Sequence, residues 1–417
     1  MIVKNNLLEE EIHYNKINGL DVYICKKNNY EKKIAMFGTK YGSLDNTFEY
    51  NNEKIKVPDG VAHFLEHKLF EQEGENALDL FAKEGISANA YTSFDQTVYF
   101  FETIDKYTIG LEMLIKLVKT PYFTDENVIK EQGIIGQEIA MYDDSPEAVV
   151  YYNALRCMYK DIPLNIDIAG TKETISKINK DILYKCYNTF YNLDNMFMVI
   201  VGDVNIDESY KLIQNNLNLY ENNNFKVKKY IQKESKDIVE KEIVKDMGLS
   251  MPMIYIGYKL DVVKNNDIIK REVISDYIFE LFFSKSSKFY IDNYNKGYIS
   301  SDIEFVCESN NDFSHILVSV STSKLDEFKP ILTEYINNLK NIKIDINKFE
   351  NVKKKMIGEH IFNSEELNNT YRYIIDSILN ESKLYIFEEY LKNISLEDIK
   401  DILDKLTTKN EVISIVK

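Results

Sequence analysis

The sequence predicts an α+β fold of two homologous domains, each a mainly antiparallel sheet backed by helices. Two observations support this prediction. Strand-like segments run beside helical segments of roughly 12 to 18 residues, and the same series of elements occurs twice, about 220 residues apart. A repeat of this length indicates a two-unit body rather than a solenoid.

The duplication can be followed through matching segments. These are Ile134–Ile139 with Met356–Ile361, Ile178–Leu183 with Ile394–Ile399, and the closing strands Met196–Val201 with Glu411–Val416. Val98–Thr103 and Ser314–Ser321 are further predicted strands. The polar stretch around Glu221–Lys226 is a natural connection. We therefore expect one domain at residues 1–220, a linker at 221–235 and a second domain at 236–417.

Composition and net charge indicate which classes of protein this chain fits. The 417 residues are 44% hydrophobic and 28% charged, which is typical of a soluble globular protein of two or more domains. The net charge of −16 argues against non-specific nucleic-acid binding. It could favour cationic peptides in an acidic cavity, or only keep the protein in solution.

The sequence also predicts a location. No apolar stretch is long enough to span a membrane, and Met1–Glu11 lacks the hydrophobic region of a signal peptide. The four cysteines are scattered, which favours reduced thiols over disulfides or a second metal site. We expect a cytoplasmic protein.

The most informative segment is Asp59–Phe70, which contains two histidines four residues apart with a glutamate between them. On a helix, His63, Glu66 and His67 project within one arc of about 100°. Two imidazoles on adjacent turns can bind one Zn²⁺, and the carboxylate can accept a proton from water. This is the H-x-x-E-H arrangement. The alternative is an ordinary core helix, since apolar residues fill the rest of the segment.

A zinc site of this kind needs a third protein ligand. A helix is predicted from Thr124 or Asp125 to Met141, and it places Glu131 and Glu138 on one face, two turns apart. Either glutamate could instead lie on a solvated face, and spacing alone does not choose between them. Two glycines within the helix, at 133 and 136, predict the close approach of another element.

The motif, with Glu138 following 71 residues after His67, resembles the pitrilysin family of inverted-motif zinc peptidases. That family includes insulin-degrading enzyme and the mitochondrial processing peptidase. The resemblance implies that His63, His67 and Glu138 bind one Zn²⁺ per chain. It also implies that Glu66 is the general base and that Glu131 supports the site from behind the ligands.

The resemblance continues through Gly85–Phe100, which is similar to the strand after the zinc helix in that family. It implies that Asn89, Ala90, Tyr91 and Thr92 bind an extended peptide as an added strand. The alternative is an ordinary hairpin strand ending in the turn at Phe94-Asp95.

The implied activity is that of a zinc metalloendopeptidase acting on extended peptides, in precursor processing or in the turnover of short peptides. Two alternatives stay open. One is a non-catalytic peptide-binding or scaffold subunit of a peptidase complex, and the other is a zinc enzyme with a non-peptide substrate.

The second copy lacks the metal motif and departs from the family pattern. Active members present an arginine and a tyrosine seven residues apart, with a glycine between them. Anchored on Gly297, these positions hold Asn293 and Ser300, and a register shifted by two holds Ile291 and Tyr298. Neither supplies the guanidinium.

The missing arginine bears on the partner of this chain. It favours a heterodimer with a half-length homologue over a homodimer, and the chain resembles the metal-bearing subunit of paired bacterial peptidases of this family. His360 occupies the place of Glu138 in the second copy and is interpreted as structural.

Overall fold

The first sheet has seven strands in the order β1-β2-β3-β11-β4-β10-β9. The computed structural model describes residues 1–5, 7–221 and 225–417. The strands are β1 (Ile2–Asn5), β2 (Glu10–Ile17), β3 (Leu20–Lys26), β4 (Lys33–Thr39), β9 (Ser87–Thr92), β10 (Thr97–Thr103) and β11 (Met196–Gly202). Neighbours pair antiparallel except β3 and β11, which pair parallel. Two small hairpins, β5 (Thr47–Tyr50) with β6 (Glu53–Lys56) and β7 (Glu71–Gln72) with β8 (Glu75–Asn76), lie outside this sheet.

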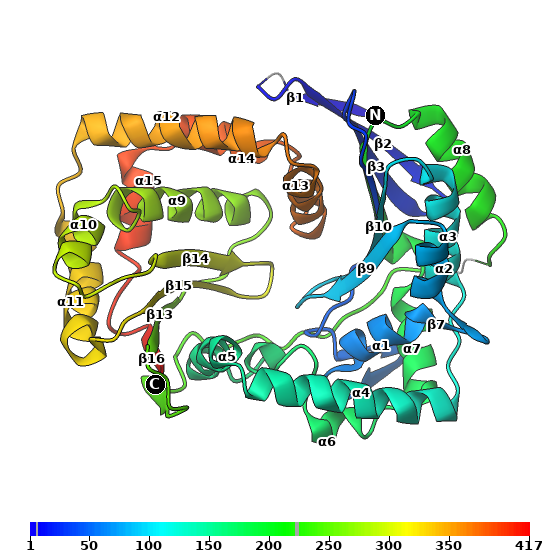
Figure 1. Ribbon diagram of the computed structural model, residues 1–417, viewed down its shortest axis with the longest axis horizontal. Coiled ribbons are helices and arrows are strands. Elements are labelled where there is room, and N and C mark those ends of the chain that lie inside the picture. Colours follow the sequence, from blue (N-terminus) through cyan, green and yellow to red (C-terminus); the bar gives the residue numbers. More distant parts are fainter. Residues whose placement is uncertain (6, 222–224) are drawn as a thin grey trace. The chain divides into compact units, whose positions relative to one another are not determined.

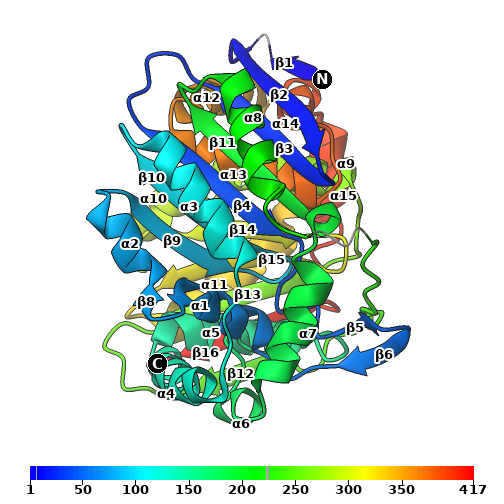
Figure 2. The same cartoon turned by 90° about the vertical axis from the view of Figure 1, so that its right-hand side faces the viewer.

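Helices cover this sheet on both faces. They are α1 (Val61–Phe70), α2 (Ala77–Lys83), α3 (Tyr107–Lys119), α4 (Asp125–Asp143), α6 (Lys172–Ile175), α7 (Lys180–Phe190), α8 (Ile206–Leu217) and α13 (Leu367–Leu379). Helices α3 and α8 pack on one face, and α13 packs against β11 on the other (Figure 1). Figure 2 shows α3 and α8 crossing in front of the strands. Helix α1 contacts β9 and α7 at one end of the sheet.

The second sheet has five strands in the order β12-β16-β13-β15-β14. They are β12 (Glu242–Lys245), β13 (Met253–Lys259), β14 (Glu304–Ser309), β15 (Ser314–Ser321) and β16 (Glu411–Val416). Its helices are α5 (Pro146–Met158), α9 (Asn266–Phe282), α10 (Lys288–Asn295), α11 (Leu325–Asn338), α12 (Ile346–Asn363), α14 (Ile386–Asn393) and α15 (Leu396–Leu403). Helix α9 packs against β14, and α5 packs against β13 and β16 on the opposite face (Figure 1).

The predicted duplication and fold class are confirmed by the pairing of the strands. Strands β3, β4, β9, β10 and β11 correspond in chain order and in pairing to β12, β13, β14, β15 and β16. In each set the first and last strands pair parallel and the other pairs are antiparallel. The predicted strands at Ser314–Ser321 and Glu411–Val416 have the observed bounds.

The chain forms two compact units, and each includes a segment from the other half of the sequence. The first consists of Met1–Ala140, Ile166–Ile231 and Asn363–Leu379. The second consists of Met141–Asn165, Gln232–Phe362 and Asn380–Lys417. The expected boundaries at 1–220, 221–235 and 236–417 stay a prediction about the sequence repeat. Residues 222–224 of the expected linker lie outside the described residues.

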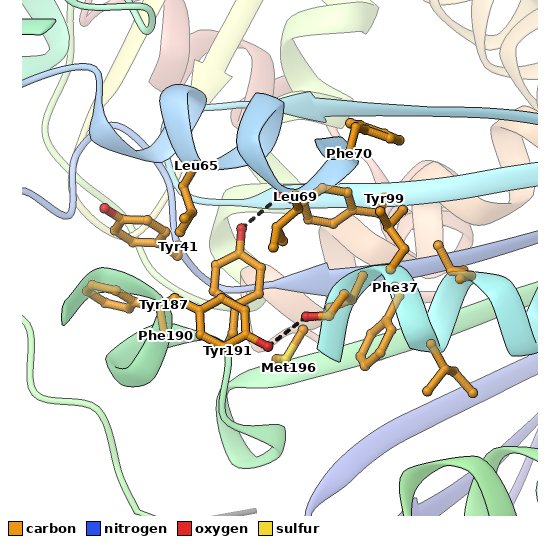
Figure 3. Close-up of a cluster of buried hydrophobic side chains, with 14 of the residues drawn as sticks. Phe37, Tyr41, Leu65, Leu69, Phe70, Tyr99, Tyr187, Phe190, Tyr191 and Met196 are labelled. Atoms are coloured by element: carbon orange, nitrogen blue, oxygen red, sulfur yellow. Dashed lines mark hydrogen bonds between the residues drawn. The ribbon is translucent and has the colours of Figure 1, made fainter. Parts of the chain in front are cut away.

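Aromatic residues dominate the core beneath α1. Leu65 and Leu69 point from α1 into a cluster that includes Tyr99 and Tyr191 (Figure 3). The hydroxyl groups of these two tyrosines lie 2.9 Å apart and form a buried hydrogen bond. The apolar side of α1 is thereby held in place, which orients its polar side.

The cysteine prediction is confirmed and the glycine prediction is partly wrong. All four cysteines are free thiols. A Cβ atom added at Gly133 would meet nothing within 4 Å, because this residue lies on the exposed side of α4, and at Gly136 it would only touch a methyl group of Ile175 at 4.0 Å. Among the described residues, no helix combines the length and hydrophobicity needed to cross a membrane.

Candidate metal centre

The start of α1 is set by two glycines that pack backbone against backbone. Gly60 precedes the helix with φ 92°, and a Cβ there would overlap the carbonyl oxygen of Ala169. Gly170 has φ 80°, and its Cβ would lie 2.6 Å from the carbonyl oxygen of Asp59. Glycine adopts positive φ without the Cβ clash that other residues meet. This close contact determines where α1 begins and therefore where His63 lies.

Helix α4 provides the acidic side of the site. Thr124 caps its N-terminus, because the Thr124 hydroxyl accepts a hydrogen bond from the backbone N–H of Asn127 at 3.2 Å. Asn127 completes the cap by accepting from the N–H of Thr124 at 2.9 Å. Glu131 and Glu138 then follow on the same face of the helix.

His63, His67 and Glu138 converge on one point. His63 Nε2 lies 3.7 Å from Glu138 Oε1, and His67 Nε2 lies 3.6 Å from Glu138 Oε2. One donor atom from each of the three residues lies within 4.8 Å of the others. Two imidazole nitrogens and one carboxylate oxygen are the donor set of many catalytic zinc sites, so these residues fit the ion.

The protonation states of the site follow from burial and neighbouring charge. Burial, together with the charge of His67, lowers the pKa of His63 to about 3, so its imidazole is neutral at pH 7. Burial lowers the pKa of His67, but the hydrogen bond to Glu131 and nearby carboxylates outweigh it, and the net pKa lies above the usual value. Burial raises the pKa of Glu66, against the opposing hydrogen bond from Thr92.

The two histidines differ in the hydrogen-bond partner of Nδ1, the ring nitrogen that does not face Glu138. His67 Nδ1 lies 3.1 Å from Glu131 Oε1, which fixes the tautomer that leaves Nε2 free to face Glu138. His63 Nδ1 is buried without a hydrogen-bond partner among the described residues. The structure therefore brings Glu131 to one histidine of the pair.

Glu66 lies between the metal-ligand candidates and β9. Its side chain is buried, and its Oε2 accepts a hydrogen bond from the Thr92 hydroxyl at 2.6 Å. A cavity of about 990 Å³ opens beside Glu66 and His67. Its lining includes Phe70, Tyr122, Glu71, Glu75, Glu126 and Lys130. Glu66 and one of the metal-ligand candidates, His67, thus border one open space.

The strand predicted to bind substrate is β9. It is the last strand of its sheet and pairs with β10 only among the described strands. Asn89 lines the cavity beside Glu66, Ala90 and Tyr91 continue the strand, and Thr92 contacts Glu66. The predicted turn at Phe94-Asp95 separates β9 from β10. One edge of β9 therefore has main-chain groups available for a further strand.

One residue of the site, Lys68, was not predicted from the sequence. The Lys68 side chain is completely buried and contacts Glu71, Glu131 and the carbonyl oxygen of Asn127. The signal was present, because a charged residue in an otherwise apolar part of α1 requires a partner. The identity of that partner depends on the position of α4.

The remaining sequence candidates, in the second unit, do not belong to the metal-ligand cluster found among the described residues. Asn293 is buried in α10, and its amide donates to the carbonyl oxygen of Phe289 at 2.8 Å. Gly297 has φ 69° just beyond the end of this helix. His360 Nε2 lies 2.8 Å from Glu388 Oε1, which agrees with a structural role.

The fold and the site define a class: a duplicated α+β protein whose inverted H-x-x-E-H helix faces a glutamate from a second helix. The family model Insulinase (Peptidase family M16) matches residues 50–172. The model Peptidase M16 inactive domain matches residues 177–356. The chain belongs to peptidase family M16, and the resemblance predicted from the sequence is confirmed.

Two of the similar proteins match nearly the whole chain, and a third matches about a third of it. A Bacillus subtilis protein named Uncharacterized zinc protease YmfH is 38% identical over 411 residues, covering 95% of this chain and 94% of that protein. The crystal structure of a putative M16-like peptidase from Alicyclobacillus acidocaldarius has a TM-score of 0.93 at 28% identity and covers 98% of both chains. Mitochondrial-processing peptidase subunit beta of Lentinula edodes is 30% identical over 160 residues, covering 37% of this chain and 34% of that protein.

Proposed function

We propose that this protein is a zinc metalloendopeptidase that hydrolyses extended peptides. The observation that carries the proposal is the convergence of His63, His67 and Glu138 within 4.8 Å, with the buried carboxylate of Glu66 beside them. Membership of a peptidase family with relatives named zinc protease supports the same activity.

Each residue has a role that its environment supports. When bound, a zinc ion supplies Lewis acidity, which acidifies water and polarises a peptide carbonyl. Glu66 accepts the proton of the attacking water and delivers it to the leaving amine. Burial raises the pKa of Glu66 toward neutral pH, and a pKa near the working pH favours both the uptake and the release of a proton. The hydroxyl of Thr92 orients the carboxylate through its hydrogen bond.

The substrate lies along β9 as an added strand. Residues Asn89, Ala90, Tyr91 and Thr92 would pair with it through main-chain hydrogen bonds. Because backbone pairing carries little side-chain information, short unfolded peptides of varied sequence and precursor segments both suit this mode. The glutamates that line the adjacent cavity favour peptides with basic side chains.

The partner is a half-length homologue that supplies the missing arginine. Asn293 stands where the family pattern places that arginine, and its amide is already bonded to the backbone of its own helix. A heterodimer accounts for this departure, and a homodimer with full activity would contradict it. A cytoplasmic location is part of the same proposal, supported by four cysteines without a disulfide.

The lack of an arginine also favours a second candidate, a peptide-binding scaffold subunit without catalysis of its own. Hydrolysis separates the two. The purified chain, loaded with zinc, is incubated with a quenched peptide library, alone and with each half-length homologue that the same genome is found to encode. We expect cleavage that Glu66→Gln abolishes, by about a thousandfold or more, with zinc content unchanged.

Glu359→Gln is the matched control, because Glu359 is an exposed glutamate on α12 of the second unit. Cleavage that persists in Glu66→Gln would remove Glu66 from its role. Zinc binding without cleavage in any combination of subunits would leave the scaffold candidate as the function.

A further inference from the structure

Lys68 is an unusual residue at its position. It directly follows the second histidine of the motif, and its side chain is completely buried. Lysine side chains generally keep the ammonium group in water, because burying a charge is costly unless it is paired. Here the Nζ atom donates to the carbonyl oxygen of Asn127 at 3.2 Å and to the carboxylate of Glu71. It also lies 3.5 Å from Glu131 Oε2. The side chain therefore connects α1 to α4 by charge-assisted contacts.

Glu131 is shared between Lys68 and His67. Its Oε1 atom lies 3.1 Å from His67 Nδ1, whereas its Oε2 atom faces the ammonium group of Lys68. A carboxylate engaged through both oxygens has little freedom to rotate. Its direction toward His67 is thus set partly by a residue that does not itself touch the metal-ligand atoms.

The other histidine shows why this matters. His63 Nδ1 has no hydrogen-bond partner within the described ranges, so no hydrogen bond at this second nitrogen orients that ring. Of the two histidines, His67 is the one whose direction depends on a hydrogen bond. The direction in which His67 presents Nε2 to a metal ion then depends on how firmly the Glu131 carboxylate is held.

We propose that Lys68 is a positioning residue of the metal centre, which holds Glu131 so that His67 presents Nε2 to the ion. The inference rests on the proposed zinc function. A purely structural role is the competing explanation, since contacts with Glu71 and Asn127 would join α1 to α4 without affecting the metal.

The test measures zinc affinity by competition with a chromophoric chelator, which does not depend on catalysis. Lys68→Met removes the ammonium group and keeps the chain length. We expect zinc to bind about tenfold more weakly or worse, the range found when groups that orient metal ligands are removed. Glu71→Gln, which still accepts a hydrogen bond from Lys68, is the control and should stay within about twofold of the unmodified protein.

A double variant separates the two explanations. If Lys68 acts through Glu131, then Lys68→Met combined with Glu131→Gln binds zinc about as weakly as Glu131→Gln alone. Two results would overturn the inference. One is that Lys68→Met binds zinc as tightly as the unmodified protein, and the other is that the fold-losses in zinc affinity of the two single variants multiply in the double variant. A lower melting temperature of the zinc-free protein with full zinc affinity would point to the structural role and would also overturn it.

Two further conditions keep the outcome clear. If Lys68→Met does not fold, Lys68→Gln is measured in its place by the same criteria, since the amide retains hydrogen bonds without the charge. An unmodified protein that binds no zinc would overturn the proposed function together with this inference, whereas zinc binding that is insensitive to Lys68 would overturn this inference alone.

Discussion

The two units share one sheet topology and differ in the pair of helices that could form a site. In the first unit, α1 and α4 bring two histidines and two glutamates together. In the second, α9 contains no histidine, and α12 has Lys353 and His360 where α4 has Glu131 and Glu138. Lys353 donates to the backbone oxygens of Lys392 and Ile394, and His360 bonds to Glu388.

The comparison shows that the duplicated fold supplies positions rather than chemistry. The same sheet with the same helix order can support a metal centre or an ordinary interior, depending on a few donor residues. Lys353 and His360 of α12 are used for internal contacts, and the metal-ligand cluster found among the described residues lies in the first unit.

The largest expected effect tests this difference directly. His63→Ala removes a donor from the cluster, and we expect zinc affinity to fall by about a thousandfold, since a three-residue donor set does not tolerate the loss of one member. His360→Ala removes an imidazole from the matching helix pair of the second unit and should leave zinc affinity unchanged. Chelator competition measures both. Zinc loss in His360→Ala would break the distinction between the units.

The pH dependence of peptide cleavage sharpens the role of Glu66. The base must be deprotonated, so activity of the zinc-saturated protein should fall on the acid side as Glu66 takes up a proton. Thr92 donates a hydrogen bond that lowers the pKa of Glu66. Thr92→Val should therefore move the acid limb to higher pH, and Thr92→Ser should leave it in place. An acid limb that shifts to lower pH in Thr92→Val would contradict the assignment.

The packing at the start of α1 predicts a smaller effect on stability. Gly60→Ala introduces a Cβ at a φ of 92° and against the backbone of Ala169, so we expect a loss of about 2 kcal/mol or more in the free energy of unfolding. Chemical denaturation measures this loss. An unchanged free energy of unfolding would show that the close backbone contact between Gly60 and Ala169 is not needed to fix the start of α1.

The smallest effect should be the same in both units. Gly133 in α4 and Gly358 in α12 lie on exposed sides of the two corresponding helices, and a Cβ at either would meet nothing within 4 Å. Replacing either with alanine should stabilise the protein by about 0.5–1 kcal/mol through helix propensity. Destabilisation by Gly133→Ala, with no change in zinc binding, would indicate a contact on that face of α4 with another chain.

Much of the fold could be predicted because it depends on local patterns. The predicted strands Ser314–Ser321 and Glu411–Val416 have the observed bounds, and the repeated order of elements predicted the matching sheets. The sequence did not predict that each compact unit includes a segment from the other half of the chain. Helix α5 joins the second unit and α13 joins the first, and such long-range packing leaves no periodic trace in the sequence.

The sequence by itself determined that His63, Glu66 and His67 share one face of a helix, since a spacing of three and four residues imposes it. It also carried the family pattern that singled out Glu138. Tertiary structure alone decided that Glu131 faces His67, that Lys68 is buried against Glu131, and that the free edge of β9 lies beside Glu66. These are contacts between elements distant in the chain, whose distances depend on how helices and strands pack rather than on any local preference.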